Sequence, residues 1–222
     1  MLGGLSAQSG GTVKYEFTQH VEPPEDRPQR KARKRVMQYD LTFTKEQSIY
    51  EKDTEFEDPN ADERSRRWWR QNKPHVIYYD HKEEKTVEQV NFFKKDFLLS
   101  DTIETLQWKI VASEQRDILG YTAMRAILKD TSRMVDAWFT PQLTYSVGPS
   151  DFYGLPGLIL AVAVDEEKVM LAKSITLSEE TPSIDIPKKG KKMNRTDYEK
   201  MREEKTAEMK KNWKNSSRRW RK

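Results

Sequence analysis

Histidine and cysteine supply much of the metal and nucleophilic chemistry of proteins, and this chain of 222 residues has three histidines and no cysteine. The lack of cysteine excludes disulfides, thiolate catalysis and cysteine-bound zinc. His75 and His81 lie six residues apart, so on one continuous strand both side chains would share a face. Such a pair needs a third ligand to hold a metal ion well, and the sequence does not identify one. We therefore expect ordinary histidines, no metal site and no cofactor.

Hydrolytic motifs are equally sparse. The sequence contains neither a Gly-x-Ser-x-Gly nucleophile elbow nor a His-Glu-x-x-His zinc motif. Ser150 and Asp151 are adjacent, but the nearest histidine along the chain is His81, so no local triad is indicated. The acidic run Asp165–Glu167 fits a hairpin turn, and spacing along a chain does not define a glycosidase cleft. We predict a non-enzymatic protein and keep a hydrolase as the least favoured alternative.

A cationic and aromatic cluster occupies residues 64–70, which read Arg-Ser-Arg-Arg-Trp-Trp-Arg. Arginine and tryptophan side chains together can stack on sugars or bases and pair with phosphate. The alternative is structural, with Trp68 and Trp69 covering the inner face of a sheet while the arginines stay in solvent. We take the Trp pair as candidate ligand-binding residues and leave both interpretations open.

Alternation of apolar and polar residues predicts that β-strands position these groups. Every second residue is apolar in Val13–Phe17, Met37–Phe43, Leu106–Ile110 and Val135–Phe139. Strands with one buried and one solvated face are typical of antiparallel sheets. About ten short strands joined by polar turns predict a mainly β fold, a single curved antiparallel sheet that forms an open half-barrel meander. The remaining strands are expected at 75–81, 86–93, 95–100, 121–129, 158–165 and 168–177.

Composition divides the chain into residues 1–11, 12–187 and 188–222. The first part is rich in Gly and Ser, and it reads either as the remnant of a signal peptide cut near Ala7 or as a flexible leader. The second part is the β domain. The third part is a basic tail, either helical or disordered. The longest apolar run, Leu158–Val164, is much shorter than the roughly 20 residues of a membrane helix.

The tail carries 15 Lys and Arg against 5 Asp and Glu, a net charge of +10, which leaves residues 1–187 with a net charge of −6. After a charged linker, Lys188–Asn194, the sequence Thr196–Glu199 fits a capping box, so we predict a helix that runs to about Lys214. Each Lys or Arg near an anionic membrane contributes about 1 kcal/mol of binding free energy. The tail is therefore either an anionic-surface binder, for anionic lipid or lipopolysaccharide, or a solvated end. The candidate residues are Lys210, Lys211, Arg218, Arg219 and Arg221.

The most distinctive segment runs from Asp136 to Ile159. Pro141 cannot donate to a central ladder and therefore ends a strand. Gly148-Pro149 and Gly154-Leu155-Pro156-Gly157 then supply two tight reversals. Leu158–Val164 leaves the second reversal as a strand buried on both faces. Turn residues that pack among aromatic side chains usually have a structural role rather than a chemical one. In the alternative, functional interpretation, the loop 141–157 lines the mouth of a cavity, with Tyr145, Phe152 and Tyr153 as its walls.

Gly154–Ile159 spells Gly-Leu-Pro-Gly-Leu-Ile, and in this the chain resembles the GLPGLI family, secreted or periplasmic proteins of Bacteroidetes-type bacteria. Leu106–Trp108, Gly120–Ala126 and Ala137–Pro141 resemble the family as well. A family cysteine is replaced in the region of Ala123 and Met124, so no role tied to a thiol is expected. The resemblance implies export and a β-rich fold, and it implies little about activity. The motif residues are Trp138, Pro141, Gly148, Pro149, Gly154, Leu155, Pro156, Gly157, Leu158 and Ile159.

These observations favour a non-enzymatic binding protein of the cell envelope, which would carry an apolar ligand in a deep apolar cavity on its curved sheet. The alternative is an envelope interaction protein that docks an outer-membrane transporter or an anionic surface through its basic tail, and it would show a filled core and an exposed patch. A hydrolase would show titratable groups with shifted pKa values that converge in a cleft. We expect no nucleic acid partner, because an exported protein does not meet it.

Overall fold

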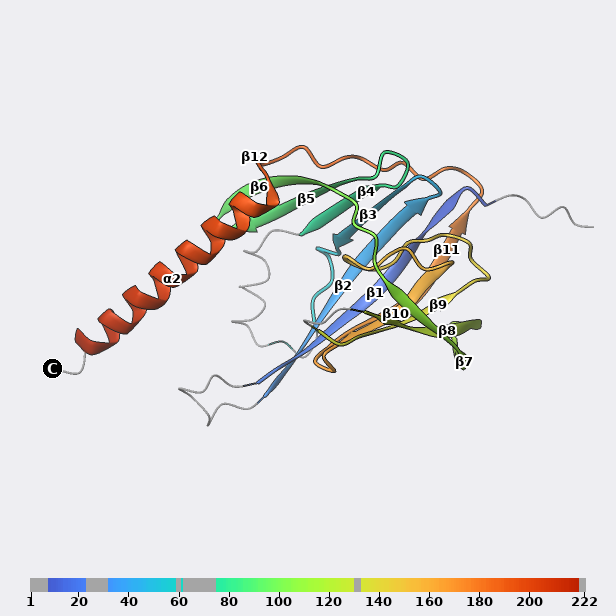
Figure 1. Cartoon of the computed structure of the whole chain (residues 1–222), viewed down its shortest axis with the longest axis horizontal. Coiled ribbons are helices and arrows are strands. Elements are labelled where there is room, and N and C mark those ends of the chain that lie inside the picture. Colours follow the sequence, from blue (N-terminus) through green and yellow to red (C-terminus); the bar gives the residue numbers. More distant parts are fainter. Residues whose placement is uncertain (1–7, 23–31, 59–60, 62–74, 130–132, 220–222) are drawn as a thin grey trace, which may run out of the picture.

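The computed structural model describes residues 8–22, 32–58, 61, 75–129 and 133–219. Its strands form one twelve-stranded sheet in the order β12-β6-β5-β4-β3-β2-β1-β11-β10-β9-β8-β7, followed by one long helix, α2 (Figure 1). The elements are β1 Gly10–Val21, β2 Arg33–Thr44, β3 Gln47–Lys52, β4 Val76–Asp80, β5 Lys85–Phe92, β6 Lys95–Thr102, β7 Trp108–Ile118, β8 Tyr121–Leu128, β9 Val135–Thr140, β10 Leu158–Val164, β11 Lys168–Ser178, β12 Lys191–Met193 and α2 Arg195–Arg219.

The prediction of a mainly β fold built on a single open sheet is confirmed. The first eleven strands pair antiparallel with their neighbours, whereas β12 pairs parallel with β6, so the sheet is mixed rather than purely antiparallel. Several hairpins turn without glycine. Phe93 and Lys94 both take positive φ between β5 and β6, as do Asp165 and Glu166 between β10 and β11. The hairpin turn predicted at Asp165–Glu167 is therefore present.

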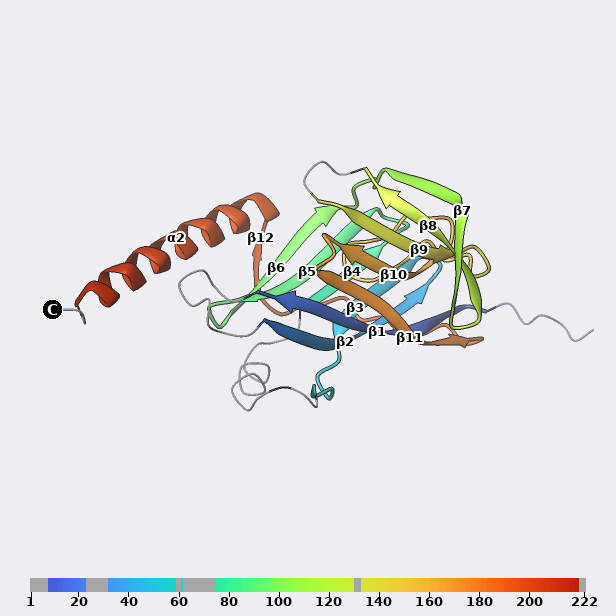
Figure 2. The same cartoon turned by 90° about the horizontal axis from the view of Figure 1, so that it is seen from below.

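The connection between β6 and β7 forces the sheet to curl. These strands lie ten positions apart in the sheet order, a distance of about 48 Å in a flat sheet with ~4.8 Å between strands. Residues 103–107 are all that joins them, and five residues span no more than about 20 Å. The two ends of the sheet must therefore approach each other. Figure 2 shows the sheet curled rather than flat.

Two strands were missed by the sequence analysis, for different reasons. In β3, Ser48, Ile49 and Tyr50 are all buried, so the strand lacks the alternation that reveals a strand exposed on one face. In β12, three polar or flexible residues of a segment that we expected to be a linker pair with Phe97–Leu99 of β6. A segment that pairs with an existing sheet edge forms backbone hydrogen bonds whatever its side chains are. Amino-acid composition therefore does not predict such a strand.

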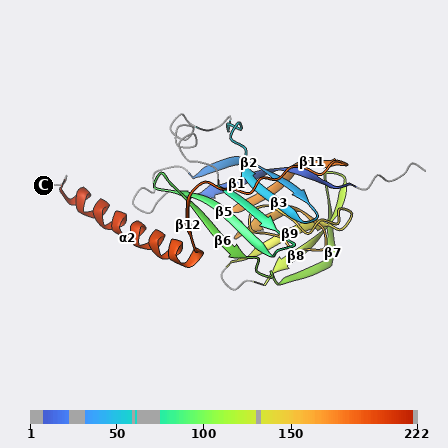
Figure 3. The same ribbon diagram turned by 90° about the horizontal axis from the view of Figure 1, so that it is seen from above.

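The helix begins earlier and ends later than predicted. Its cap is Asn194, whose side-chain oxygen accepts a hydrogen bond from the Asp197 backbone N–H at 2.7 Å. The predicted capping box at Thr196 is therefore wrong by two residues, and α2 continues to Arg219 rather than ending near Lys214. Tyr198 and Met201 pack with Phe97 and Leu99 of β6. Beyond these first two turns α2 projects away from the sheet (Figure 3).

Strand β10 is buried on both faces, as expected, and joins two apolar clusters. Leu158 and Leu160 belong to the cluster that contains Val13, whereas Ile159 and Val162 belong to the cluster that contains Phe139. A bulge between Ile159 and Ala161 shifts the register with β9. The Ile159 carbonyl accepts a hydrogen bond from the buried Tyr15 hydroxyl at 2.5 Å, and its N–H donates to the Val147 carbonyl at 3.0 Å. These bonds fix β10 to both β1 and the preceding loop.

No helix in the part of the chain that the structure describes is long and apolar enough to cross a membrane. The described helix carries charged residues throughout its 25 residues, including nine Lys and Arg.

The two glycines of the Gly-Leu-Pro-Gly turn should tolerate alanine differently. A Cβ on Gly157 (φ +151°) would lie 2.1 Å from the Thr140 carbonyl oxygen, whereas a Cβ on Gly154 (φ +83°) would meet no atom within 4 Å. We expect Gly157→Ala to lower the free energy of unfolding by about 3 kcal/mol or more and Gly154→Ala by about 1–2 kcal/mol. Urea denaturation of both variants measures the difference, and equal losses would contradict the close-approach argument.

Candidate functional site

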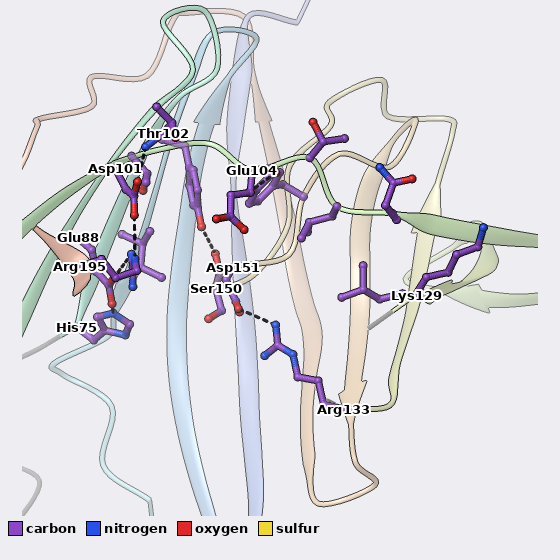
Figure 4. Close-up of a pocket in the computed structure, with 18 residues that line it drawn as sticks. His75, Glu88, Asp101, Thr102, Glu104, Lys129, Arg133, Ser150, Asp151 and Arg195 are labelled. Atoms are coloured by element: carbon purple, nitrogen blue, oxygen red, sulfur yellow. Dashed lines mark hydrogen bonds and ion pairs between the residues drawn. The ribbon is translucent and has the colours of Figure 1, made fainter. Parts of the chain in front are cut away.

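A cleft of about 640 Å³ opens where the two ends of the curled sheet approach each other. Strands β4, β5 and β6 supply one wall, the connector 103–107 and the end of β8 supply another, and the loop before β10 supplies the floor (Figure 4). The lining is His75, Ile77, Tyr79, Thr86, Glu88, Asp101, Thr102, Glu104, Thr105, Leu106, Gln107, Leu128, Lys129, Arg133, Ser150, Asp151, Tyr153 and Arg195.

One wall of the cleft is a network around Glu88. Its carboxylate contacts His75 Nε2 at 2.5 Å and the Arg195 guanidinium at 2.6 Å. The same guanidinium lies 3.3 Å from the carboxylate of Asp101. The Glu88 side chain is only 12% exposed, and a buried charge of this kind needs such partners. Arg195 is the first residue of α2, so the tail contributes directly to the wall.

The network controls the ionisation of Glu88. Burial alone would raise the pKa of this carboxyl, but the hydrogen bonds and positive charges of His75 and Arg195 outweigh it and lower the pKa below its ordinary value. Glu88 therefore stays ionised to a lower pH than an ordinary glutamate, which suits a structural ion pair.

Two tyrosine rings meet at the floor of the cleft, Tyr79 from β4 and Tyr153 from the loop before β10. The Tyr79 ring lies 5.0 Å from the Tyr153 ring, and its hydroxyl donates to the Ser150 carbonyl at 3.3 Å. Burial raises the pKa of Tyr79 well above its ordinary value, with a further contribution from the charge of Asp151. The Tyr153 hydroxyl donates to the Glu104 carbonyl at 2.7 Å, which links the floor to the connector. Both rings are therefore neutral and fixed in position.

The opposite side carries a second ion pair. Arg133 contacts Asp151 at 3.1 Å and lies over the Phe152 ring, with its guanidinium carbon 5.2 Å from the ring centre. Both side chains are partly exposed, so the pair is weaker than the Glu88 network. The cleft thus presents charges that are mostly paired within the protein, together with the side chains of Thr102, Thr105 and Gln107, which have no hydrogen-bond partner among the described residues.

The three aromatic residues predicted to line a cavity are placed differently. Tyr153 lines the cleft. Tyr145 and Phe152 do not, and we correct that expectation. Tyr145 packs against Phe43 with ring centres 4.7 Å apart and donates to the Gln8 carbonyl, while Phe152 is 1% exposed in the core. Both turn inward because the loop fills the concave side of the sheet.

The family-motif residues serve the packing of this loop. Trp138, Pro149, Leu155, Leu158 and Ile159 are buried, and Pro141 and Pro156 are exposed at the turns. A Cβ on Gly148 would lie 2.7 Å from the Phe152 carbonyl oxygen. The motif residues hold the segment that carries Ser150, Asp151 and Tyr153, which line the cleft. None of the ten motif residues lines the cleft itself.

The remaining predicted site residues are either outside the described part of the chain or in α2. Trp68, Trp69 and Arg221 lie outside the described residues. Lys210, Lys211, Arg218 and Arg219 belong to the part of α2 that projects from the sheet.

His75 and His81, which flank β4, have different surroundings. His75 joins the Glu88 network, whereas His81 stacks on Tyr79 and lies 3.1 Å from the Ser48 hydroxyl. Burial lowers the pKa of His81. Within the described ranges, no group of three or more His, Cys, Asp or Glu side chains is arranged to hold a metal ion.

Four residues of the cleft were not predicted from the sequence: Glu88, Asp101, Glu104 and Arg195. Glu88 had a detectable signal, because it shares a strand face with Val90 and Phe92, which pack against the core, and is therefore a charge among inward-facing residues. Arg195 had none, since it is 107 residues away from Glu88 and reaches it only through the docking of β12 and α2.

Comparison with known proteins gives a partial match. A family described as "Protein of unknown function (Porph_ging)", which is associated with Bacteroidetes, matches residues 129–161, the segment that contains the Gly-Leu-Pro-Gly-Leu-Ile turn. No curated protein matches the sequence.

Solved structures of PNGF-II share the fold. The structure in space group P21 has 16% identity and a TM-score of 0.59, and it covers 87% of this chain and 33% of its own chain. The structure in space group C2 has 16% identity and a TM-score of 0.56, covering 86% and 32%. This chain therefore spans about a third of the length of these proteins, and the likeness shows the fold alone.

Removing the Glu88 charge should change stability in a pH-dependent way. The folded-state pKa of Glu88 lies below the ordinary value of 4.5, so its ion pairs stabilise the fold above that pH, and the stabilisation is lost as the pH falls through the folded pKa. We expect Glu88→Gln to lower the free energy of unfolding by about 1–3 kcal/mol at pH 7 and by progressively less below pH 4.5. Glu104→Gln is the matched control and should change stability by less than about 0.5 kcal/mol. A Glu88→Gln loss that does not shrink in acid would refute the assignment.

Proposed function

We propose that this chain is a non-enzymatic binding module that holds a polar ligand in the cleft between the two ends of its curled sheet. The observation that carries the proposal is the cleft itself, because its volume of about 640 Å³ suits a small ligand or a short segment of a larger one. Its fixed walls, built on the Glu88 network and on the Tyr79 and Tyr153 floor, are organised before any ligand arrives, which reduces the entropy lost on binding.

The chemistry of the lining determines the class of ligand. We expected an apolar ligand, but the described cleft is lined mainly by carboxylates, cations, hydroxyls and amides. An apolar molecule would cover the Thr102, Thr105 and Gln107 side chains, which have no hydrogen-bond partner among the described residues, without offering them a hydrogen bond, and each such group costs about 1–3 kcal/mol. A polar ligand can replace the water that they bind. The residues that could contact it without breaking an ion pair include Thr102, Thr105 and Gln107.

Catalysis has less support than binding. A general acid near neutral pH needs a carboxyl whose pKa is raised, whereas the pKa of Glu88 is lowered. Burial raises a carboxyl pKa at Glu51, but Glu51 lies on β3 and does not line the cleft. We therefore propose that the module binds without turning over its ligand.

We further propose that the module belongs to the GLPGLI group and works in the periplasm or outside the cell, because the turn motif and its surroundings resemble that family. Immunodetection in fractionated source cells tests the location, and a signal confined to the cytoplasm would refute it.

A second candidate function is attachment to an anionic surface through α2. The helix projects from the sheet (Figure 1), and its residues 209–219 contain five Lys and Arg but no Asp or Glu. These features support contact with anionic lipid or lipopolysaccharide, or with an acidic patch on an envelope protein such as an outer-membrane transporter.

Blocking the cleft should abolish ligand binding without unfolding the protein. Thr105 is exposed in the connector, and Thr144 is also exposed but does not line the cleft. We expect Thr105→Trp to abolish the NMR shift changes that small polar ligands (monosaccharides, amino acids and short peptides) cause in cleft residues, while Thr144→Trp preserves them. If palmitate binds in the cleft and none of the polar probes does, the proposed ligand class is wrong.

Neutralising the helix end should weaken attachment to anionic surfaces. Replacing Lys210, Lys211, Arg218, Arg219 and Arg221 by Gln removes five charges yet keeps β12 and Arg195, which a truncation at residue 187 would remove. At about 1 kcal/mol per charge, we expect binding to anionic vesicles to fall by at least about 100-fold at low salt. Co-sedimentation with phosphatidylglycerol vesicles measures it, and unchanged binding would exclude this role for the tail.

A further inference from the structure

Most of the charges that line the cleft already have partners within the protein. Arg195 contacts the carboxylates of Glu88 and Asp101, and Arg133 contacts Asp151. The carboxylate of Glu104 differs, because it makes no hydrogen bond or ion pair with any described residue. A charge that the protein does not neutralise is available to a ligand.

Glu104 is held in place although its carboxylate is free. Its carbonyl accepts the hydrogen bond of the Tyr153 hydroxyl at 2.7 Å, and the preceding Ile103 N–H donates to the Glu84 carbonyl at 2.9 Å. The carboxylate, which has no partner among the described residues, therefore starts from a backbone that is fixed by the Tyr153 hydroxyl. A carboxylate that is held in place and has no cationic partner in the described part of the protein favours a cationic group on a ligand.

Lys129 is the counterpart of opposite sign. Its ammonium group makes no ion pair with any residue in the described ranges, while its backbone N–H donates to the Gln107 carbonyl at 2.9 Å and so fixes the end of β8 to the connector. Figure 4 shows Glu104 and Lys129 well apart along the cleft. The two free charges therefore do not neutralise each other directly.

Between these two charges the connector offers uncharged polar side chains. Thr105 and Gln107 lie on it and line the cleft. A hydroxyl and an amide donate to carbonyl groups and accept from N–H groups, so they match the peptide bonds of an extended segment.

We propose that the cleft recognises a short peptide segment that carries both charges, with a Lys or Arg side chain bound by Glu104 and a carboxylate bound by Lys129. The inference rests on the proposed binding function and names its ligand class. The paired charges of Arg195 and Arg133 shape the walls, and the two unpaired charges select the ligand.

The test uses four capped peptides and the full chain. Acetyl-Lys-Gly-Gly-Glu-amide carries both charges, and replacing Lys, Glu or both by Gln gives the cation-free, anion-free and neutral forms. Dissociation constants come from NMR titration of the unmodified chain, Glu104→Gln, Lys129→Gln and the control Glu203→Gln, which removes a carboxylate from the exposed part of α2. Glycerophosphoethanolamine, which has an ammonium and a phosphate but no peptide bond, is the fifth probe.

We expect the doubly charged peptide to bind best, with each removed charge weakening binding by about 3- to 10-fold. Glu104→Gln should erase only the preference for Lys over Gln, and Lys129→Gln only the preference for Glu over Gln, while Glu203→Gln changes neither. Equal binding of the four peptides, preferences that survive in the cleft variants, or tighter binding of glycerophosphoethanolamine would overturn the inference.

Failure of the inference is distinct from failure of the proposed function. If no peptide binds, but another polar ligand binds the unmodified chain and does not bind Thr105→Trp, the ligand class is wrong and the binding function stands. If no polar ligand gives a signal that Thr105→Trp removes, both are wrong.

Discussion

A five-residue connection constrains this structure more than any other feature. Residues 103–107 join β6 to β7, which would lie about 48 Å apart in a flat sheet, and so the sheet has to close on itself until its ends almost meet. The cleft is a direct consequence. The connector supplies one of its walls, and the two ends of the sheet supply the others.

The curled sheet encloses a concave side that must be filled, and the loop before β10 fills it. Tyr15 and Val147 hold Ile159 at the bulge, and the close approach of Gly157 to Thr140 sets the direction of the turn. The loop then reaches both halves of the sheet. The Ser150 carbonyl accepts a hydrogen bond from the hydroxyl of Tyr79 on β4, and the Tyr153 carbonyl accepts one from the indole N–H of Trp108 on β7. A motif with an architectural role thus positions the floor of the candidate site.

The tail shows how a charged appendage becomes part of a site. Composition separates residues 188–222 from the rest of the chain, yet β12 pairs with β6, and Tyr198 packs with Phe97 and Leu99. These contacts place Arg195 against Glu88 and Asp101. The cleft wall and the projecting helix are therefore joined at Arg195, and beyond its first two turns α2 projects away from the sheet.

The sequence by itself determined the mainly β fold, ten of the twelve strands and the tight turns around Gly154 and Gly157, because alternation and turn chemistry are local properties. Tertiary structure decided where the loop aromatics lie, turning Tyr145 and Phe152 into the core and leaving Tyr153 at the cleft. It also brought together Glu88, Asp101 and Arg195, whose contact depends on curling and on docking of the tail. Long-range pairing of this kind leaves no periodic signal along the chain, so the fold was largely predictable and the candidate site was not.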